Sequence, residues 1–393
     1  MTETVIVAAV RTAIDDFGGT LKDVSALELG KIVIIEVIRR AGLSKDDVDE
    51  VTFGNVLPAG LGQNPARQAM LMAGLPVKVG ALTINKVCGS GLKAIMISDQ
   101  AIRLGDADII VAGGMENMYQ APYYLPRARD GYRMSDGKII DGMIHDGLWD
   151  ILGDLHMGRA TENVAERYKV SRKEQDEYAC LSYARAQKAW AAGKFKEEIV
   201  PFEIPQRKGP PKIFDTDEVC QRQTTLEALG KLPPAFKENG TITAGNSSKI
   251  SAGAAAVVLM SSETARKRGI KPLARIIAQG AAGIDVAIPT AAPINSIPKV
   301  LKKAGLQEKD IDLHEINEAF AASTIAVMKE LNIDQDKVNV NGGAISLGHP
   351  IGCSGARLVV TLLNALKQRD LKRGMVSLCL GGAEAVSLIL ERV

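Results

Sequence analysis

The sequence repeats itself at a separation of about 263 residues. Residues 41–49 (AGLSKDDVD) align with residues 304–312 (AGLQEKDID), with five identities in nine positions. Further matches follow in the same order at nearly the same offset: residues 90–93 lie over 354–357, and residues 113–116 lie over 381–384. Chance matches would not stay collinear, so the chain contains two copies of one ancestral unit. Each copy alternates helices and strands around a glycine-bearing loop, which predicts an α/β fold with mainly parallel sheets.

Residues 119–250 have no counterpart in the other half and hold both tryptophans, Trp149 and Trp190. We therefore expect three units in one compact body. Residues 1–118 plus 251–271 form the amino-terminal half, 119–250 an inserted loop domain, and 272–393 the carboxyl-terminal half. Within the insertion, Ser171 and Glu174 have the spacing of a helix-capping box.

Composition excludes several classes of protein. The chain has 393 residues, 46% of them hydrophobic, and a net charge of +2, which predicts a folded protein without the basic footprint of a nucleic-acid binder. It has no run of about 18 apolar residues and no signal peptide at its start, so we expect a soluble, cytoplasmic protein that does not engage membranes. The cysteines are five in number, without a CxxC pair, and predict free thiols. No ligand spacing predicts a metal site.

Reactive side chains follow several of the predicted strands, where ligands bind in α/β sheets. The repeat lays residues 349–352 over residues 85–88, so Cys88 and His349 should meet near a pseudo-twofold axis. Cys88 opens a helix, which predicts a lowered thiol pKa and a nucleophile, although a small buried residue filling the turn is the alternative. His349 precedes Pro350 and could accept a proton from that thiol, whereas a lone loop histidine is usually just solvated.

Two further residues have a structural alternative beside the functional one. Cys379 ends a buried strand beside Gly381 and Gly382, where it is either a core residue or a second reactive thiol. Asn317 follows another strand and is either a helix cap or a catalytic amide. Glu318 and Glu384 are expected to be structural carboxylates.

These residues stand in motifs that resemble the thiolase family. The motifs cover essentially the whole chain in the family's order: residues 85–91 (NKVCGSG), 156–158 (HMG), 244–248 (AGNSS), 317–320 (NEAF), 342–345 (GGAI), 348–352 (GHPIG) and 379–382 (CLGG). The resemblance implies a duplicated thiolase fold, five-layered α/β/α/β/α with an inserted loop domain. It also implies a homo-oligomer, either a dimer or a dimer of dimers.

The resemblance assigns a role to each reactive residue. Cys88 carries the acyl group, His349 activates it, and Cys379 exchanges the α-proton of the second acetyl group. Asn317 holds a water that supports the enolate together with His349, and the backbone N–H groups of Cys88 and Gly381 form the oxyanion hole. One cysteine cannot serve both steps, because acylated Cys88 has no free sulfur.

The insertion is expected to hold coenzyme A, which enters as a substrate thioester; no permanently bound cofactor is expected. The residues that the resemblance assigns to the acyl, pantetheine and nucleotide contacts are Leu148, His156, Met157, Ser248, Ala319, Phe320 and Arg222. Loop packing is the alternative for these residues. Arg127, Arg129, Arg133 and Lys138 resemble a basic tetramer-forming loop; otherwise they form a solvated face.

The chain departs from the family in three places. Many relatives read Gly-Gly-Gly-Met-Gly where this chain has residues 381–385 (GGAEA), and residues 249–252 (KISA) replace a more usual Gly-x-Asn-Asp. Gln221 stands where some relatives have an arginine near the nucleotide, and we expect the neighbouring Arg222 to substitute for it.

The expected activity is an acyltransferase that condenses two acetyl-CoA to acetoacetyl-CoA and free CoA, or runs the reverse thiolysis. A degradative 3-ketoacyl-CoA thiolase of broader chain length is the alternative. A decarboxylating ketoacyl synthase is less favoured, because it would replace Cys379 with His or Asn. A carrier or partner-binding protein would not need Cys88, His349, Asn317 and Cys379 together.

Overall fold

The computed structural model describes residues 2–206 and 209–393. Its main strands are hydrogen-bonded in the order β13-β14-β15-β12-β1-β11-β4-β2-β3. The amino-terminal half contributes β1 (Thr4–Arg11), β2 (Glu50–Gly54), β3 (Gly80–Ile84), β4 (Ile109–Asn117) and β11 (Ala252–Ser261). The carboxyl-terminal half contributes β12 (Ala274–Gly283), β13 (Leu313–Ile316), β14 (Arg373–Leu380) and β15 (Glu384–Arg392).

The two halves meet where β1 pairs with β12, and each half has the same strand order outward from this seam. In the amino-terminal half the order is β1, β11, β4, β2 and β3. In the other half it is β12, β15, β14 and β13, followed by a parallel bridge between His314 and Val338. The strand order therefore shows the duplication that the sequence repeat predicts.

The prediction of mainly parallel sheets is wrong. Within the described nine-stranded sheet, β2 pairs in parallel with β3 and β4, and β13 with β14, while the other neighbours are antiparallel. Strands joined through helices are parallel, whereas β14 and β15 are joined by a tight turn that reverses the chain. Asn317 directly follows β13 and Cys379 lies near the end of β14, so the ends of this parallel pair still share one edge.

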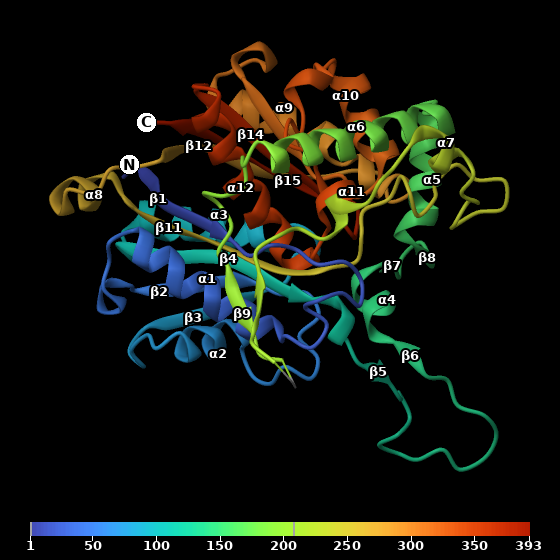
Figure 1. The fold of residues 1–393 in the computed structure, drawn as a ribbon, viewed down its shortest axis with the longest axis horizontal. Helices are drawn as coiled ribbons and strands as arrows, with labels where there is room; N and C mark the ends of the chain where they lie inside the picture. Colours follow the sequence, from blue (N-terminus) through green and yellow to red (C-terminus); the bar gives the residue numbers. More distant parts are fainter. Residues whose placement is uncertain (1, 207–208) are drawn as a thin grey trace.

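Helices form the other layers, and the five-layered α/β/α/β/α arrangement is confirmed (Figure 1). On the amino-terminal side lie α1 (Ala26–Arg40), α2 (Pro65–Met72) and α8 (Ser262–Arg268); on the carboxyl-terminal side lie α9 (Pro293–Ala304), α10 (Ala321–Leu331) and α11 (Ala344–Leu347). The central layer consists of α3 (Ser90–Leu104) and α12 (Ile351–Gln368), which contact strands of both halves. Because α12 is covered on every side, even its consecutive residues Leu358, Val359 and Val360 are fully buried.

The segment 119–250 adds short ribbons and helices around one end of the body. These are β5 (Tyr123–Tyr124), β6 (Ile140–Asp141), α4 (Gly142–Gly147), β7 (Trp149–Asp150), β8 (Leu155–His156), α5 (Met157–Arg167), α6 (Arg172–Ala191), β9 (Phe202–Ile204), β10 (Lys212–Phe214) and α7 (Leu226–Gly230). The predicted capping box at Ser171 and Glu174 is present at the start of α6. The division into three units stays a prediction. Among the described residues, no helix combines the length and the apolar character needed to cross a membrane.

Candidate active site

The amino-terminal ends of α3 and α12 touch through two glycines that are equivalent in the repeat. A Cβ on Gly91 would lie 2.9 Å from the carbonyl oxygen of Gly352, and a Cβ on Gly355 would lie 2.3 Å from the nitrogen of Leu92. A side chain at either position would force the two helices apart. This close approach brings the loop before α3, with Cys88, beside the loop before α12, with His349.

Cys88 lies in the sharp turn that enters α3. The preceding residue, Val87, has a φ of 46°, a left-handed conformation that costs a β-branched residue about 1–3 kcal/mol. The backbone N–H groups of Cys88 and Gly381 are near enough to the Cys88 sulfur to lower the pKa of its thiol. A Cβ on Gly381 would lie 3.2 Å from Cγ1 of Val87, so the Gly381 turn packs directly on the Cys88 loop. The two predicted oxyanion donors therefore lie in loops that contact each other.

The prediction of a lowered thiol pKa at Cys88 is wrong for the resting chain. Burial raises the pKa of Cys88 to about 11, and the nearby Glu116 carboxylate adds to this rise. The two backbone N–H groups lower the pKa but do not outweigh the loss of solvation. Cys88 is consequently a neutral thiol at rest and needs a base to become a nucleophile.

His349 is the candidate for this base. Its Nδ1 lies 2.6 Å from Oγ of Ser354, which also lies 2.9 Å from the carbonyl oxygen of Pro350. When the hydroxyl donates to that carbonyl oxygen, Nδ1 carries the ring proton and Nε2 has the free lone pair. Burial, with the nearby positive charge of Arg357, lowers the pKa of His349 to about 3, which keeps the ring neutral. Ser354 therefore sets the tautomer that accepts a proton at Nε2.

Sequence reasoning missed this role of Ser354, although the repeat contained the signal. Ser354 aligns with Ser90, and Ser90 makes the equivalent contact in the other half: its hydroxyl donates to the carbonyl oxygen of Val87 at 2.6 Å. Each serine therefore holds the reactive loop that precedes its helix.

Asn317 is buried directly after β13, and its Nδ2 lies 3.4 Å from Nε2 of His349. Among the described residues, its Oδ1 has no hydrogen-bond partner. A buried polar atom of this kind is a site for an ordered water or a substrate group. The position agrees with the expected role of Asn317 in holding a water, and that role stays a prediction.

Cys379 lies near the end of β14 and is almost fully buried. Burial raises the pKa of its thiol, and the charge of a Cys88 thiolate would raise it further. The residues next to the two cysteines are in contact, since a Cβ on Gly89 would lie 2.4 Å from Cδ2 of Leu380. The structure thus packs together the segments of two thiols that are 291 positions apart in the sequence.

Two apolar clusters surround the thiols. The Cys88 cluster consists of buried Val56, Leu57, Met118 and Ile351 with half-buried Cys88, Ala121, Met143, Leu148 and Ile250. The Cys379 cluster consists of buried Ile242, Ala319, Phe320 and Cys379 with half-buried Met157 and Phe236. Four of the predicted substrate residues, Leu148, Met157, Ala319 and Phe320, are therefore brought beside one thiol or the other.

Two of the remaining predicted substrate residues, His156 and Ser248, contact members of the Cys379 cluster. His156 caps α5, since its Nδ1 accepts from the N–H of Gly158 at 3.0 Å, and its ring stacks on Phe236 at 4.8 Å between centroids. The N–H of Ser248 donates to the carbonyl oxygen of Ala319 at 3.0 Å. Arg222 is exposed and pairs with Asp16, so its guanidinium is already partnered in this structure.

Two buried carboxylates hold the loops around the site. Glu116 accepts from the side chain of Asn55 at 2.7 Å and from the backbone N–H groups of residues 56, 57 and 352. Glu318 accepts from Tyr178, Ser182 and Asn339 at 2.7–3.0 Å. The structural role expected for Glu318 is confirmed, whereas that of Glu116 was missed.

Comparisons with known proteins agree with this geometry. Residues 4–263 match the thiolase amino-terminal domain and residues 270–392 the thiolase carboxyl-terminal domain. The chain belongs to the thiolase family. A relative from Pseudomonas aeruginosa, named acetyl-CoA acetyltransferase, is 53% identical over 392 residues and covers 100% of both chains. One of the same name from Allochromatium vinosum is 52% identical over 389 residues, 99% of each chain. The crystal structure of the Bacillus anthracis acetyl-CoA acetyltransferase superposes with a TM-score of 0.98 at 44% identity, covering 100% of this chain and 99% of the other.

Two residues at which this chain departs from many other thiolases, Glu384 and Lys249, make specific contacts in the structure. Glu384, where many thiolases have Met, forms an ion pair with Lys86 beside the nucleophile loop. Lys249, in place of the more usual Gly, donates from Nζ to the carbonyl oxygen of Ser247 at 2.8 Å. Burial and the nearby Arg222 lower the pKa of Lys249 to about 8.

Proposed function

We propose that this thiolase condenses two molecules of acetyl-CoA reversibly to acetoacetyl-CoA and CoA, through an acyl-enzyme on Cys88. The observation that supports the proposal is the close packing of the segments that carry Cys88, Cys379 and His349. The names of the relatives support the substrate, and a reaction of this kind belongs to the metabolism of acyl-CoA thioesters, including those of fatty acids.

In the first half-reaction, Nε2 of His349 takes the proton of the Cys88 thiol, and the sulfur attacks the thioester carbonyl of acetyl-CoA. The negative charge that develops on the carbonyl oxygen accepts from the N–H groups of Cys88 and Gly381. Loss of one such donor costs a hydrolase about 10²–10³ in rate, which indicates how much this pair contributes. The carbon–sulfur bond to CoA breaks, and Cys379 gives its proton to the leaving CoA thiolate.

This step leaves an acetylated Cys88, a protonated His349 and a Cys379 thiolate. Because burial raises the pKa of Cys379, its thiolate is a stronger base than an ordinary one and suits the weakly acidic methyl group of a second acetyl-CoA. The enolate oxygen accepts from Nε2–H of His349 and from the water held by Asn317. The enolate carbon attacks the acetyl group on Cys88, and the departing sulfur recovers its proton from His349.

We propose that the insertion holds the coenzyme A part of both substrates. Leu148 and Met157, with His156, Ala319 and Phe320, provide apolar and aromatic contacts for the acyl and pantetheine groups. Ser248 contacts the pantetheine, and Arg222 contacts the nucleotide. Coenzyme A acts as a substrate, and no permanently bound cofactor takes part.

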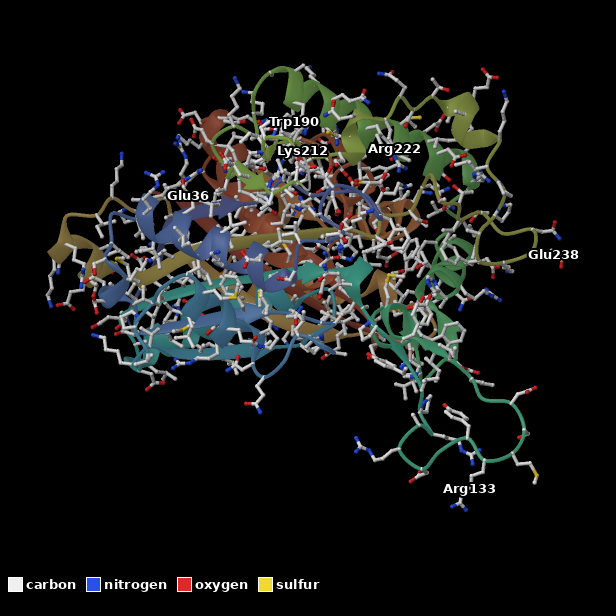
Figure 2. The ribbon with its side chains drawn as sticks, turned by 60° about the horizontal axis from the view of Figure 1, so that its bottom comes forward. Glu36, Arg133, Trp190, Lys212, Arg222 and Glu238 are labelled. Atoms are coloured by element: carbon white, nitrogen blue, oxygen red, sulfur yellow. The ribbon has the colours of Figure 1, made fainter. Side chains whose placement is uncertain are left out.

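We propose a homotetramer, built as a dimer of dimers. The loop between β5 and β6 extends away from the body, with Arg133 at its far end (Figure 2). It exposes large apolar side chains, among them Leu125 and the 89% exposed Met134, together with basic ones. Exposed apolar surface of this kind marks an interaction site, and sedimentation of the full chain measures the assembly directly.

We place the protein in the cytoplasm. All five cysteines are free thiols, a state that reducing compartments maintain.

The chain-length preference follows from the two apolar clusters. Leu148, Met143 and Ile351 belong to the apolar cluster that contains Cys88, and we propose that they limit the acyl group to a short one. We expect thiolysis of 3-ketoacyl-CoA substrates to fall sharply beyond four carbons, by about 30-fold or more per two added carbons, because each methylene that does not fit costs about 1–3 kcal/mol. Thiolysis rates across substrates of four to ten carbons measure this. A flat profile would instead assign the chain to broad degradative thiolases.

A further inference from the structure

Each of the two loops that carry a predicted oxyanion donor contains a strained residue. Val87, just before Cys88, has a φ of 46°, and Ala383, two residues after Gly381, has a φ of 59°. Residues with a Cβ keep this left-handed conformation only where the surrounding structure holds it. In many thiolases the position of Ala383 is a glycine, which adopts such a φ without strain.

An ion pair joins the residues beside these two strained positions. Nζ of Lys86, next to Val87, contacts Oε2 of Glu384, next to Ala383, and the two residues are 298 positions apart in the chain. The side chains are 24% and 44% exposed, so the pair is only partly screened by solvent. Many thiolases have Gly-Met where this chain has Ala383 and Glu384. The replacement thus introduces a strained backbone conformation at Ala383 and, next to it, an ion pair that joins the two halves.

The backbone on both sides of this pair is fixed. The N–H of Lys86 donates to Oγ of Ser90 at 2.8 Å, and Glu384 is the first residue of β15, paired with Leu380 of β14. Across the gap, a Cβ on Gly89 would lie 2.4 Å from Cδ2 of Leu380. The ion pair therefore links two segments whose backbones are held in place, and the N–H groups of Cys88 and Gly381 belong to the loops that it joins.

One further charged group faces the pair. Lys93 on α3 is partly buried; burial and the charge of Lys86 lower its pKa, while Glu384 raises it. The Glu384 carboxylate thus offsets the repulsion between the ammonium groups of Lys86 and Lys93, and removing it would leave that repulsion unopposed.

We propose that the Lys86–Glu384 ion pair is a clamp that fixes the distance between the N–H groups of Cys88 and Gly381. Lys86 and Glu384 are therefore positioning residues for acyl transfer. This inference rests on the proposed function. Oxyanion donors act within about 2.7–3.1 Å of the oxygen, so a small separation of the loops weakens transition-state binding more than substrate binding. The clamp therefore acts on kcat and leaves KM nearly unchanged.

The test is a double-mutant cycle with Lys86→Met, Glu384→Met and the variant that carries both changes. We expect each single change to lower kcat for thiolysis by about 5-fold, with KM within about 2-fold of the parent. We expect kcat of the double variant to be no lower than that of Glu384→Met, because the ion pair is already absent from the single variant. Lys86→Arg keeps the charge and should restore kcat to within about 2-fold of the parent.

A matched control is Lys329→Met, which breaks another long-range ion pair of similar exposure, Lys329–Glu174 at 2.6 Å, on α10 and α6. It should leave kcat unchanged. The melting temperature of each variant shows that it folds. Single variants that keep the parent kcat, or effects that multiply in the double variant, would overturn the clamp. An inactive parent chain would instead contradict the proposed function.

Discussion

Replacing Cys88 with Ala should abolish acyl-enzyme formation and lower turnover by at least about 10⁴-fold, because no other group can carry the acetyl between the two half-reactions. The measurement is mass spectrometry of the intact chain after a short exposure to acetyl-CoA. The parent should gain one acetyl group, recovered on the peptide that contains Cys88, and the variant should gain none.

Cys180→Ala is the matched control for this experiment. Cys180 is a half-buried free thiol on α6, away from the residues assigned to catalysis. That variant should acetylate like the parent. Stoichiometric acetylation of the Cys88→Ala chain would show that a different residue is the acyl carrier.

Replacing Cys379 with Ala should separate the two half-reactions. Acetylation of Cys88 should persist, because Cys88, Gly381 and His349 are intact and the CoA thiolate can leave and take its proton from water instead of from Cys379. Exchange of the methyl protons of acetyl-CoA should fall by about 10²–10⁴-fold, the usual contribution of a general base. Deuterium uptake from D₂O into acetyl-CoA, followed by mass spectrometry, measures the exchange.

Cys353→Ala serves as its control, since Cys353 is equally buried but lies in α12, outside both half-reactions. It should retain exchange, with any loss confined to stability. Unchanged exchange in Cys379→Ala would assign the α-proton to a base other than Cys379.

The arrangement of the site could be predicted because it follows from the repeat. Once residues 349–352 lie over residues 85–88, symmetry brings Cys88 and His349 to one axis. The contacts of Gly91 with Gly352 and of Gly355 with Leu92 show how closely the two helices approach. The direction of the other strands could not be predicted in this way. Whether a strand returns through a helix or through a tight turn, as at residues 381–383, depends on local backbone geometry that the hydrophobic pattern does not report.

The thiol pKa and the ion pair of the site could not be predicted from the sequence either. A position at a helix start predicts a low thiol pKa, yet desolvation by the second half of the fold outweighs the helix at Cys88. That cost appears only when segments hundreds of residues apart pack together. The same holds for Glu384, which the sequence marks as a departure from the family and whose contact with Lys86 only the fold reveals.

The central claim is that the two thiols act in one pocket, with Cys88 carrying the first acetyl group and Cys379 deprotonating the second. A crystal structure of the chain trapped with acetyl-CoA tests it most directly. The account predicts an acetyl thioester on Cys88, its carbonyl oxygen between the N–H groups of Cys88 and Gly381, and the Cys379 sulfur in contact with the methyl group of the second acetyl-CoA. An acetyl group on another residue, or a Cys379 sulfur separated by protein from that methyl group, would contradict the account.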